Sequence, residues 1–266
     1  MSFYGLTFNN IHSSQFNAYL KSKNRMTLPA RRKREIAIPG KDGTYDFGGN
    51  TFDNKVIEVQ LTLNENSLYE LRRKARQIAA WLSTSVRQPL IFDDEPDKYY
   101  LAKVYDSISP EEIADTGIVS VKFECEPFAY LLVSTAEEIT WGSNISWGSD
   151  VTWGNSSNYT FSISSPKEIM VDNPGTYKLR PVIVITGSFS SISISVNGKT
   201  FNYTEAVSNE TVTINNAKYT VKKGSVNKLN ISAGDFLELN PGENDITVSG
   251  ADLNCTITID FKPLYL

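Results

Sequence analysis

Histidine and cysteine are scarce in this chain. Its 266 residues include one histidine, His12, and two cysteines, Cys125 and Cys255. A Ser-His-Asp or Cys-His site would have to use His12, and no G-x-S-x-G sequence is present. A zinc site needs grouped Cys and His residues, which the sequence does not offer. We therefore expect no catalytic residue, no metal and no cofactor, a surface or interface role for His12, and two buried free thiols.

The chain also lacks an excess of positive charge and any long hydrophobic run. Its net charge is −4, whereas a nucleic-acid-binding protein is usually basic. No apolar run approaches the roughly 18 residues of a membrane span. The first residues, MSFYGLTFNN, show no basic segment followed by an apolar one, which a secretory signal requires. We therefore expect no membrane partner and synthesis in the cytosol.

The residues that are abundant favour β-structure. Thirteen Tyr and thirteen Phe accompany many Val, Ile and Thr residues. In the first half, the segment VIEVQLTLN alternates strictly between apolar and polar residues, which is typical of a half-buried strand. Its apolar face would be Val59, Leu61 and Leu63, and its polar face Glu58, Gln60 and Thr62.

One segment of the first half predicts a helix, over roughly residues 66–84. Asn66 or Ser67 can cap it, with Glu70 near the first turn. Trp81 near its end is expected to pack in the core. The apolar residues at helical spacing, expected on the core face, are Leu68, Leu71, Ala75, Ile78, Ala79 and Leu82.

After the helix, the segment QPLIFDDEPDKYYLAKVYDSISPE predicts a hairpin. We expect strands at 90–92 and 99–105, joined by the turn DDEPD. The carboxylates of this turn could hold a hard cation, but the turn lacks the pattern of a calcium-binding loop. A solvated turn is the favoured interpretation.

The second half predicts short alternating strands and no helix. The dipeptide Asn197-Gly198 between two alternating runs is a strong hairpin signal. Regularly spaced short strands indicate a β-sandwich or jelly roll. We thus expect a mainly β chain with three parts: an α+β domain at 1–133, a connector at 134–158 and an all-β sandwich at 159–266. The first domain would hold a β-sandwich-like sheet, one main helix and a long hairpin.

The connector carries a repeat, ITWGSNISWGSDVTWG, with Trp141, Trp147 and Trp153 six residues apart. On an extended chain these rings would point to one side, because side-chain direction repeats every two residues. Such a ridge could stack on sugar rings. Alternatively, the rings pack the connector onto the domains or onto a neighbouring subunit, which the aggregation risk of three exposed tryptophans favours.

Two neighbouring segments are candidates for an interface. ARRKRE holds a compact basic run, Arg31, Arg32, Lys33 and Arg34, in an otherwise acidic chain. It could contact nucleic acid. The better interpretation is an interface, or an edge strand whose charges discourage wrong pairing. The following PGKDGTYDFGG is a Gly- and Asp-rich loop between strands, and it does not match a phosphate-binding loop.

Four segments together resemble the distal tail proteins of long-tailed phages of Gram-positive bacteria. They occur in the family's order within residues 1–133: PGKDGTYDFGG, the helix ending in AAWL, PLIFDDEPDKYYLAKV and VKFECEPFAY. A later segment, GDFLELNPGENDITVSG, is similar to part of the family's galectin-like C-terminal sandwich.

The resemblance implies a structural protein of the virion tail tip. The N-terminal domain would close into a homo-hexameric ring that joins the tail tube protein to the tail-tip hub protein. The C-terminal sandwich would project outward and carry receptor-binding proteins. The segment at 31–49 would be a subunit-to-subunit hairpin or belt, with its basic run facing a neighbour or the lumen through which phage DNA passes. The candidate interface residues are Arg31, Arg32, Lys33, Arg34, Asp42, Tyr45 and Phe47.

Two other functions stay open at this level. The Trp141, Trp147 and Trp153 row and the galectin-like half allow a carbohydrate-binding module for host cell-wall polysaccharide. A glycosidase that uses two carboxylates is the third alternative, but nothing in the sequence favours a particular pair of acids. We expect the chain not to be an enzyme.

Overall fold

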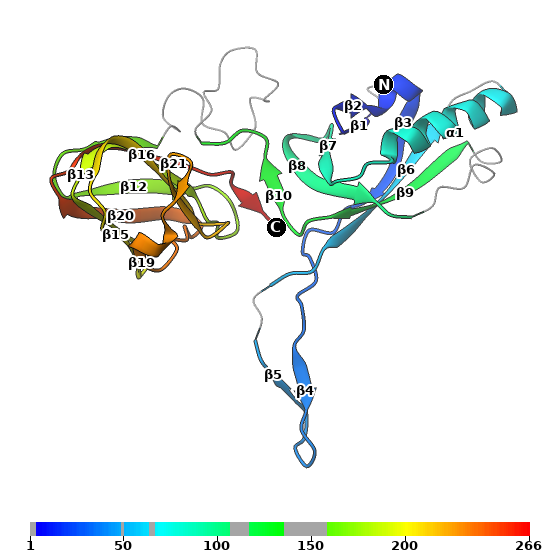
Figure 1. The fold of residues 1–266 in the computed structure, drawn as a ribbon. Helices are drawn as coiled ribbons and strands as arrows, with labels where there is room; N and C mark the ends of the chain where they lie inside the picture. Colours follow the sequence, from blue (N-terminus) through cyan, green and yellow to red (C-terminus); the bar gives the residue numbers. More distant parts are fainter. Residues whose placement is uncertain (1–3, 49–50, 64–66, 107–116, 136–158) are drawn as a thin grey trace. The chain divides into compact units, whose positions relative to one another are not determined.

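The computed structural model describes residues 4–48, 51–63, 67–106, 117–135 and 159–266 (Figure 1). It divides into two compact units, Met1–Ala129 with Leu266, and Tyr130–Tyr265. Of the expected connector 134–158, only residues 134 and 135 are described. The predicted Trp row lies entirely outside the described residues. The chain is mainly β, as predicted, with one α-helix in its described part.

The first unit is built on an antiparallel sheet. Seven of its strands follow one another in the order β2-β1-β7-β8-β9-β6-β3. Their bounds are β1 Leu6–Phe8, β2 Ile11–His12, β3 Ala18–Asn24, β6 Lys55–Leu63, β7 Gln88–Phe92, β8 Glu95–Val104 and β9 Ile118–Cys125; a short 3-10 helix, η1, spans Ser13–Phe16.

Alternation along β6 places the core on one face of this sheet. Ile57, Val59 and Leu61 are at most 1% exposed, whereas Glu58 and Gln60 between them are exposed. The predicted two faces of this strand are therefore confirmed. An antiparallel sheet can keep one polar face toward solvent while the other packs on the core.

Helix α1, Leu68–Leu82, supplies the layer over that core (Figure 1). Ser67 caps it, because its hydroxyl accepts a hydrogen bond from the Glu70 N–H at 3.3 Å, as predicted. Trp81 is 5% exposed and its indole N–H donates to the Phe8 carbonyl at 2.9 Å. Its ring stacks on Phe16 at 5.0 Å between centroids. This indole ties the last turn of the helix to the sheet.

The predicted core face of the helix was partly wrong. Ala75, Ile78 and Leu82 are buried, but Leu68 and Ala79 are exposed. The helix is rotated so that Trp81 enters the core. At 3.6 residues per turn, Leu68 and Ala79 then lie on the opposite margin of the apolar stripe.

The turn between β7 and β8 is shorter than predicted. The pairing of Phe92 with Glu95 leaves only Asp93 and Asp94 in the turn, so that β8 already begins at Glu95. Pro96 lies near the start of β8, ahead of the part that pairs with β9 from Ala102 onward.

The second unit consists of two antiparallel sheets around one core. The six-stranded sheet has the order β11-β21-β13-β16-β17-β18 and the five-stranded sheet the order β12-β20-β14-β15-β19. The strands of the first are β11 Thr160–Ile163, β13 Val182–Phe189, β16 Val207–Asn215, β17 Thr220–Lys223, β18 Val226–Asn227 and β21 Asn254–Asp260. Those of the second are β12 Lys167–Asn173, β14 Ser191–Val196, β15 Lys199–Tyr203, β19 Ser232–Gly234 and β20 Gly242–Ala251. Three further short elements are η3 Leu229–Ile231, β10 Ala129–Leu131 and β22 Leu264–Tyr265.

Inward-facing residues of both sheets form a continuous apolar cluster, as in a β-sandwich. The Asn197-Gly198 dipeptide forms the predicted two-residue turn. Val196 pairs with Lys199, and both turn residues have positive φ, 50° and 76°. These values match a type I′ turn, whose twist suits a hairpin.

Both cysteines are free and buried, as predicted. Burial raises the pKa of the Cys125 thiol to about 12, and it also raises that of Cys255. Neither thiol is therefore a ready nucleophile near neutral pH.

The core of the first unit makes a specific stability prediction. Phe123 is fully buried and its ring lies 5.2 Å from that of Phe8. We expect Phe123→Ala to lower the free energy of unfolding by about 3–5 kcal/mol, because it opens a cavity beneath the helix. Urea denaturation would measure the change. Ser120→Ala, on the exposed face of the same strand, is the control and should change stability little; equal losses would contradict the assignment of faces.

Candidate functional site

A two-stranded arm leaves the sheet of the first unit between β3 and β6 (Figure 1). Its strands are β4, Glu35–Ala37, and β5, Thr44–Asp46. Backbone hydrogen bonds continue the pairing toward the sheet: Phe47 N–H donates to Arg34 at 2.9 Å, and Asp53 N–H to Ala30 at 2.8 Å. Because β3 and β6 are themselves paired, the arm, residues 30–53, is the far part of one long hairpin.

The tip of the arm is the first part of the predicted Gly- and Asp-rich loop, whereas the later residues Thr44–Asp46 form β5 and not a loop. The Lys41 N–H donates to the Ile38 carbonyl at 3.1 Å. Gly40 and Gly43 have φ of 84° and 77°. A residue with a Cβ would be strained in this left-handed region, which accounts for both glycines.

The arm presents an apolar face that no described residue of its own unit covers. Every residue from 30 to 48 is exposed. Ile36 lies directly opposite Tyr45 and so shares a face with it. Ile38 and Phe47 follow two residues later, just past the ends of β4 and β5, and continue the same alternation. The four side chains are 45–59% exposed. The rings of Tyr45 and Phe47 meet edge to face at 5.0 Å.

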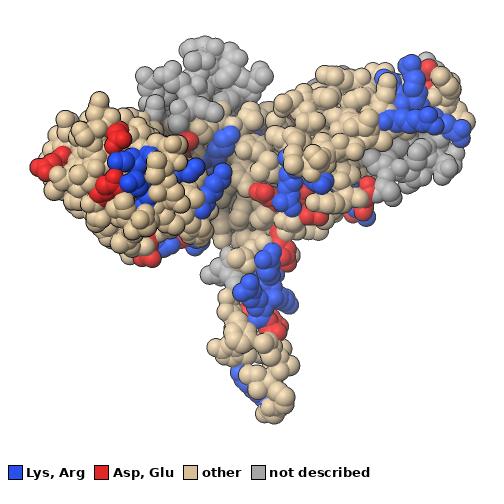
Figure 2. Space-filling model, in the orientation of Figure 1, with Lys and Arg blue, Asp and Glu red and all other residues tan. Residues whose placement is uncertain are grey.

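The predicted basic run lies between this apolar face and the sheet. Figure 2 shows basic side chains gathered along the part of the arm nearer the sheet. The Arg32 guanidinium pairs with Asp53 at 2.9 Å, and that of Arg31 lies 5.7 Å from the centre of the Phe52 ring. Lys33 and Arg34 are exposed. These contacts join the two strands of the arm across its lower part.

All seven predicted interface residues therefore lie on one arm, including the exposed Asp42 in its tip. Sequence reasoning missed Ile36 and Ile38, which extend the apolar face. Their alternation with polar or small residues in REIAI was the available signal.

An ion-pair cluster holds the segment from which the arm leaves. Arg25, just after β3, contacts Glu95 at 2.8 Å and Asp94 at 3.6 Å. Lys23 also pairs with Asp94. Burial opposes ionisation of Asp94, but hydrogen bonding to Lys23 and the charge of Arg25 outweigh it and lower its pKa. Asp94 in this turn is exposed, as the interpretation of a solvated turn expects, and Lys23 and Arg25 lie beside it in addition.

The neighbouring His12 and Asp93 have a structural role. The His12 imidazole lies 3.2 Å from the Asp93 carboxylate and also caps η1 by accepting from the Ser14 N–H. Asp93 accepts a further hydrogen bond from the Gly5 N–H at 2.6 Å. Among the residues that the structure describes, no three His, Cys, Asp or Glu side chains are grouped to hold a metal ion. No helix in the described ranges is long and apolar enough to cross a membrane.

Two protein families match this chain in sequence. Residues 14–125 match the family described as phage tail protein RIFT-related domain. Residues 174–265 match the siphovirus-type tail component, C-terminal domain. The two matches lie in the first and second unit, respectively.

The fold is similar to that of the SPP1 Dit protein (gp 19.1), whose crystal structure is described as a paradigm of the hub adsorption apparatus in phages that infect Gram-positive bacteria. The TM-score is 0.68 at 14% sequence identity, over 97% of this chain and 98% of that protein. No curated protein matches this chain in sequence.

Both families are components of siphophage tails, and the solved structure has the same fold over nearly its whole length. The chain belongs to the distal tail proteins of siphophages. It is therefore a structural component of the virion tail that associates with other tail proteins.

The exposure of the arm predicts that its apolar face does not contribute to folding of the single chain. We expect Tyr45→Ser combined with Phe47→Ser to change the free energy of unfolding by less than about 0.5 kcal/mol, because neither side chain is buried. Urea denaturation at low protein concentration would test this. Leu61→Ser, at a buried position, is the comparison and should be strongly destabilising. A large loss in the arm variant would mean that the face is covered within the chain.

Proposed function

We propose that six copies of the chain close into a ring at the tail tip, with the arm of each copy packed on a neighbouring copy. The apolar face of the arm carries this proposal. A two-stranded ribbon is at best marginally stable alone in water. Four large apolar side chains on one face of such a ribbon gain stability when a second protein surface covers them. In a ring, each arm would find the same surface on the next copy, since head-to-tail contacts can close on themselves.

The ring, formed by the domain proposed at 1–133, would join the tail tube protein to the tail-tip hub protein. The basic residues Arg31, Arg32, Lys33 and Arg34 would then face a neighbouring copy or the lumen through which phage DNA passes. The ion pair of Arg32 with Asp53 supports the first of these positions, because one of the four charges is already compensated within the arm.

The sandwich proposed at 159–266 would carry receptor-binding proteins outside the ring, with 134–158 as the connector. The alternative function, carbohydrate binding by Trp141, Trp147 and Trp153, depends on residues outside the described ranges. It stays a prediction from the sequence, because no observation of the structure favours it.

The mass of the full-length chain in solution tests the ring. Light scattering across a concentration series should approach six copies of the 29.7-kDa chain, alone or with smaller oligomers in exchange. The Tyr45→Ser/Phe47→Ser variant should shift to monomer, because it removes half of the apolar face.

A matched control replaces two exposed tyrosines elsewhere in the same unit. Tyr69 and Tyr105 are 75% and 62% exposed, and Tyr69→Ser/Tyr105→Ser should keep the mass of the unaltered chain. An arm variant that assembles normally would contradict the proposed role of the arm. A chain that stays monomeric even when mixed with its tail-tip proteins would contradict the proposed ring.

A further inference from the structure

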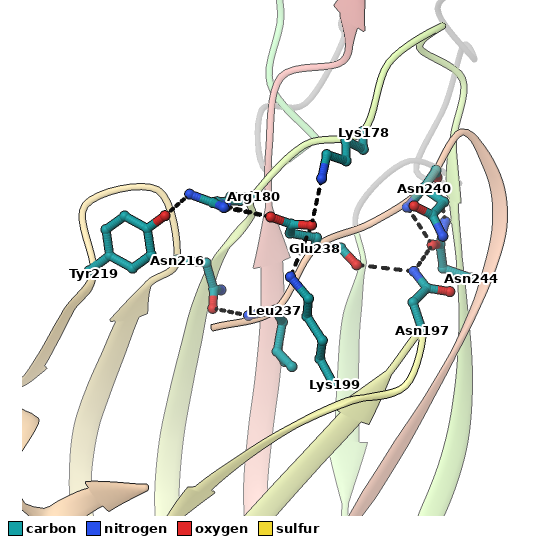
Figure 3. Close-up of polar contacts among 10 residues, drawn as sticks. All are labelled: Lys178, Arg180, Asn197, Lys199, Asn216, Tyr219, Leu237, Glu238, Asn240 and Asn244. Carbon is teal, nitrogen blue, oxygen red and sulfur yellow. Dashed lines mark hydrogen bonds and ion pairs between the residues drawn. The ribbon is translucent and has the colours of Figure 1, made fainter. Parts of the chain in front are cut away.

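The loops at one end of the C-terminal sandwich carry a group of cations around a single carboxylate (Figure 3). Its frame is a pair of backbone hydrogen bonds between Leu179 and Leu239, at 2.9 and 3.0 Å. Both leucines are buried. Because side chains alternate along extended chain, Lys178, Arg180 and Glu238 are directed away from the core.

Three cations converge on Glu238, whose side chain is 11% exposed. The Lys178 and Lys199 ammonium groups each lie 3.0 Å from its Oε2 atom. The Arg180 guanidinium donates to Oε1 at 2.6 and 2.9 Å. Burial alone would raise the pKa of Glu238, but the hydrogen bonds from Lys199, Arg180 and Lys178 lower it to about 2. The group thus holds three positive charges and one negative charge near neutral pH.

This excess is not a general feature of the sandwich. At a second carboxylate, Glu205, the cations Lys223 and Lys228 each approach to 2.8 Å. There Lys223 also pairs with Glu210 at 3.1 Å, so that two cations meet two carboxylates. Around Glu238 no other carboxylate pairs with the three cations in the described part of the chain. The group therefore carries an excess of two positive charges.

The two lysines are placed so that one anion can reach both. Each Nζ lies 3.0 Å from the same Oε2 atom, so the two are at most twice that distance, 6.0 Å, apart. Their side chains are 46% and 35% exposed. An ammonium group has three N–H donors, and Glu238 uses one from each lysine. The remaining donors are available to a ligand with several oxygens.

The loops that carry the group are held in place by asparagine side chains. The Asn197 amide donates to the Glu238 carbonyl at 3.0 Å and to Asn244 Oδ1 at 2.7 Å. Asn244, which is 1% exposed, also accepts from the Asn240 N–H at 2.8 Å and donates to its carbonyl at 2.9 Å. Lys199, which directly follows the Asn197-Gly198 turn, and the Glu238 carboxylate therefore keep a fixed relation, which lowers the entropic cost of binding.

Beside the cations lies an exposed aromatic ring. Tyr219 is 47% exposed, its hydroxyl accepts from Arg180, and the Arg180 guanidinium lies 4.9 Å from its ring centre. The ring also meets Phe236 edge to face at 5.1 Å. Arg180 gives three of its five N–H donors to Glu238 and Tyr219, so its guanidinium is held in place beside the two lysines.

We propose that Lys178 and Lys199 bind the phosphate group of a phosphate monoester or of inorganic phosphate, with Glu238 and Arg180 positioning the two ammonium groups. Such a phosphate carries about −1.5 to −2 charge at neutral pH and three acceptor oxygens. This charge matches the two uncompensated positive charges, and the oxygens can accept from both lysines at once. A carboxylate or a phosphodiester brings only one negative charge. The site is independent of the proposed ring, because all its residues belong to the C-terminal unit.

Calorimetric titration of the full-length chain tests the site, at constant ionic strength held with sodium chloride. The probes are inorganic phosphate and glycerol 3-phosphate. We expect Lys178→Gln/Lys199→Gln to weaken binding at least about tenfold, for whichever of the two probes the unaltered chain binds, since both phosphate contacts are lost. The control Lys167→Gln/Lys222→Gln removes two exposed lysines outside the group and should bind like the unaltered chain.

A second variant separates a ligand site from a structural ion cluster. Glu238→Gln keeps a side-chain oxygen that can still accept hydrogen bonds from the lysines, but it removes the negative charge that repels a phosphate. Phosphate should therefore bind several-fold more tightly and raise the melting temperature more than in the unaltered chain. Preference for glycerol 3-phosphate would identify an esterified ligand, and preference for inorganic phosphate the free ion. Unchanged binding in the lysine variant, no binding by any form, or tighter binding of an acidic peptide than of either phosphate would overturn the proposal.

Discussion

The first unit depends on burial of apolar side chains on a single face of its sheet. Along β6, residues at most 1% exposed alternate with exposed polar ones, and α1 closes over the buried side. The hydrogen bond from the Trp81 indole to Phe8 fixes how far the helix is rotated. With the sheet held in this way, the paired strands β3 and β6 set the place and direction from which the arm leaves.

The arm differs from the sheet that carries it, because its apolar face is exposed and not buried. Its base is held by the pairing of Arg25 with Glu95 and by the cross-strand contacts of Arg31 and Arg32. Its tip, in contrast, exposes large apolar side chains on one face. An arm with a firmly held base and an exposed apolar face is suited to binding a second protein, because it loses little conformational entropy on contact. This agrees with a chain that belongs to a family of structural tail proteins.

The C-terminal unit has two ion-pair clusters that differ in their balance of charge. Around Glu205 the numbers of positive and negative groups match, and the contacts can be explained by the folding of the sandwich alone. Around Glu238 they do not, although the loops there are held as firmly. An uncompensated pair of cations costs stability unless solvent or a ligand shares the charge, and it is this imbalance that distinguishes the Glu238 group.

Local patterns in the sequence determined much of this protein. Strict alternation predicted the faces of β6, the Ser67 cap predicted the start of α1, and Asn197-Gly198 predicted a hairpin turn, because each depends only on neighbours along the chain. The run at 31–47 could be recognised as an interface candidate for the same reason. Only the tertiary structure decided that Trp81 turns the helix away from Leu68, that Arg25 meets the acidic turn, and that three cations from separate segments share Glu238. These contacts join residues that are far apart in sequence, and no local pattern records which distant side chain the fold brings into reach.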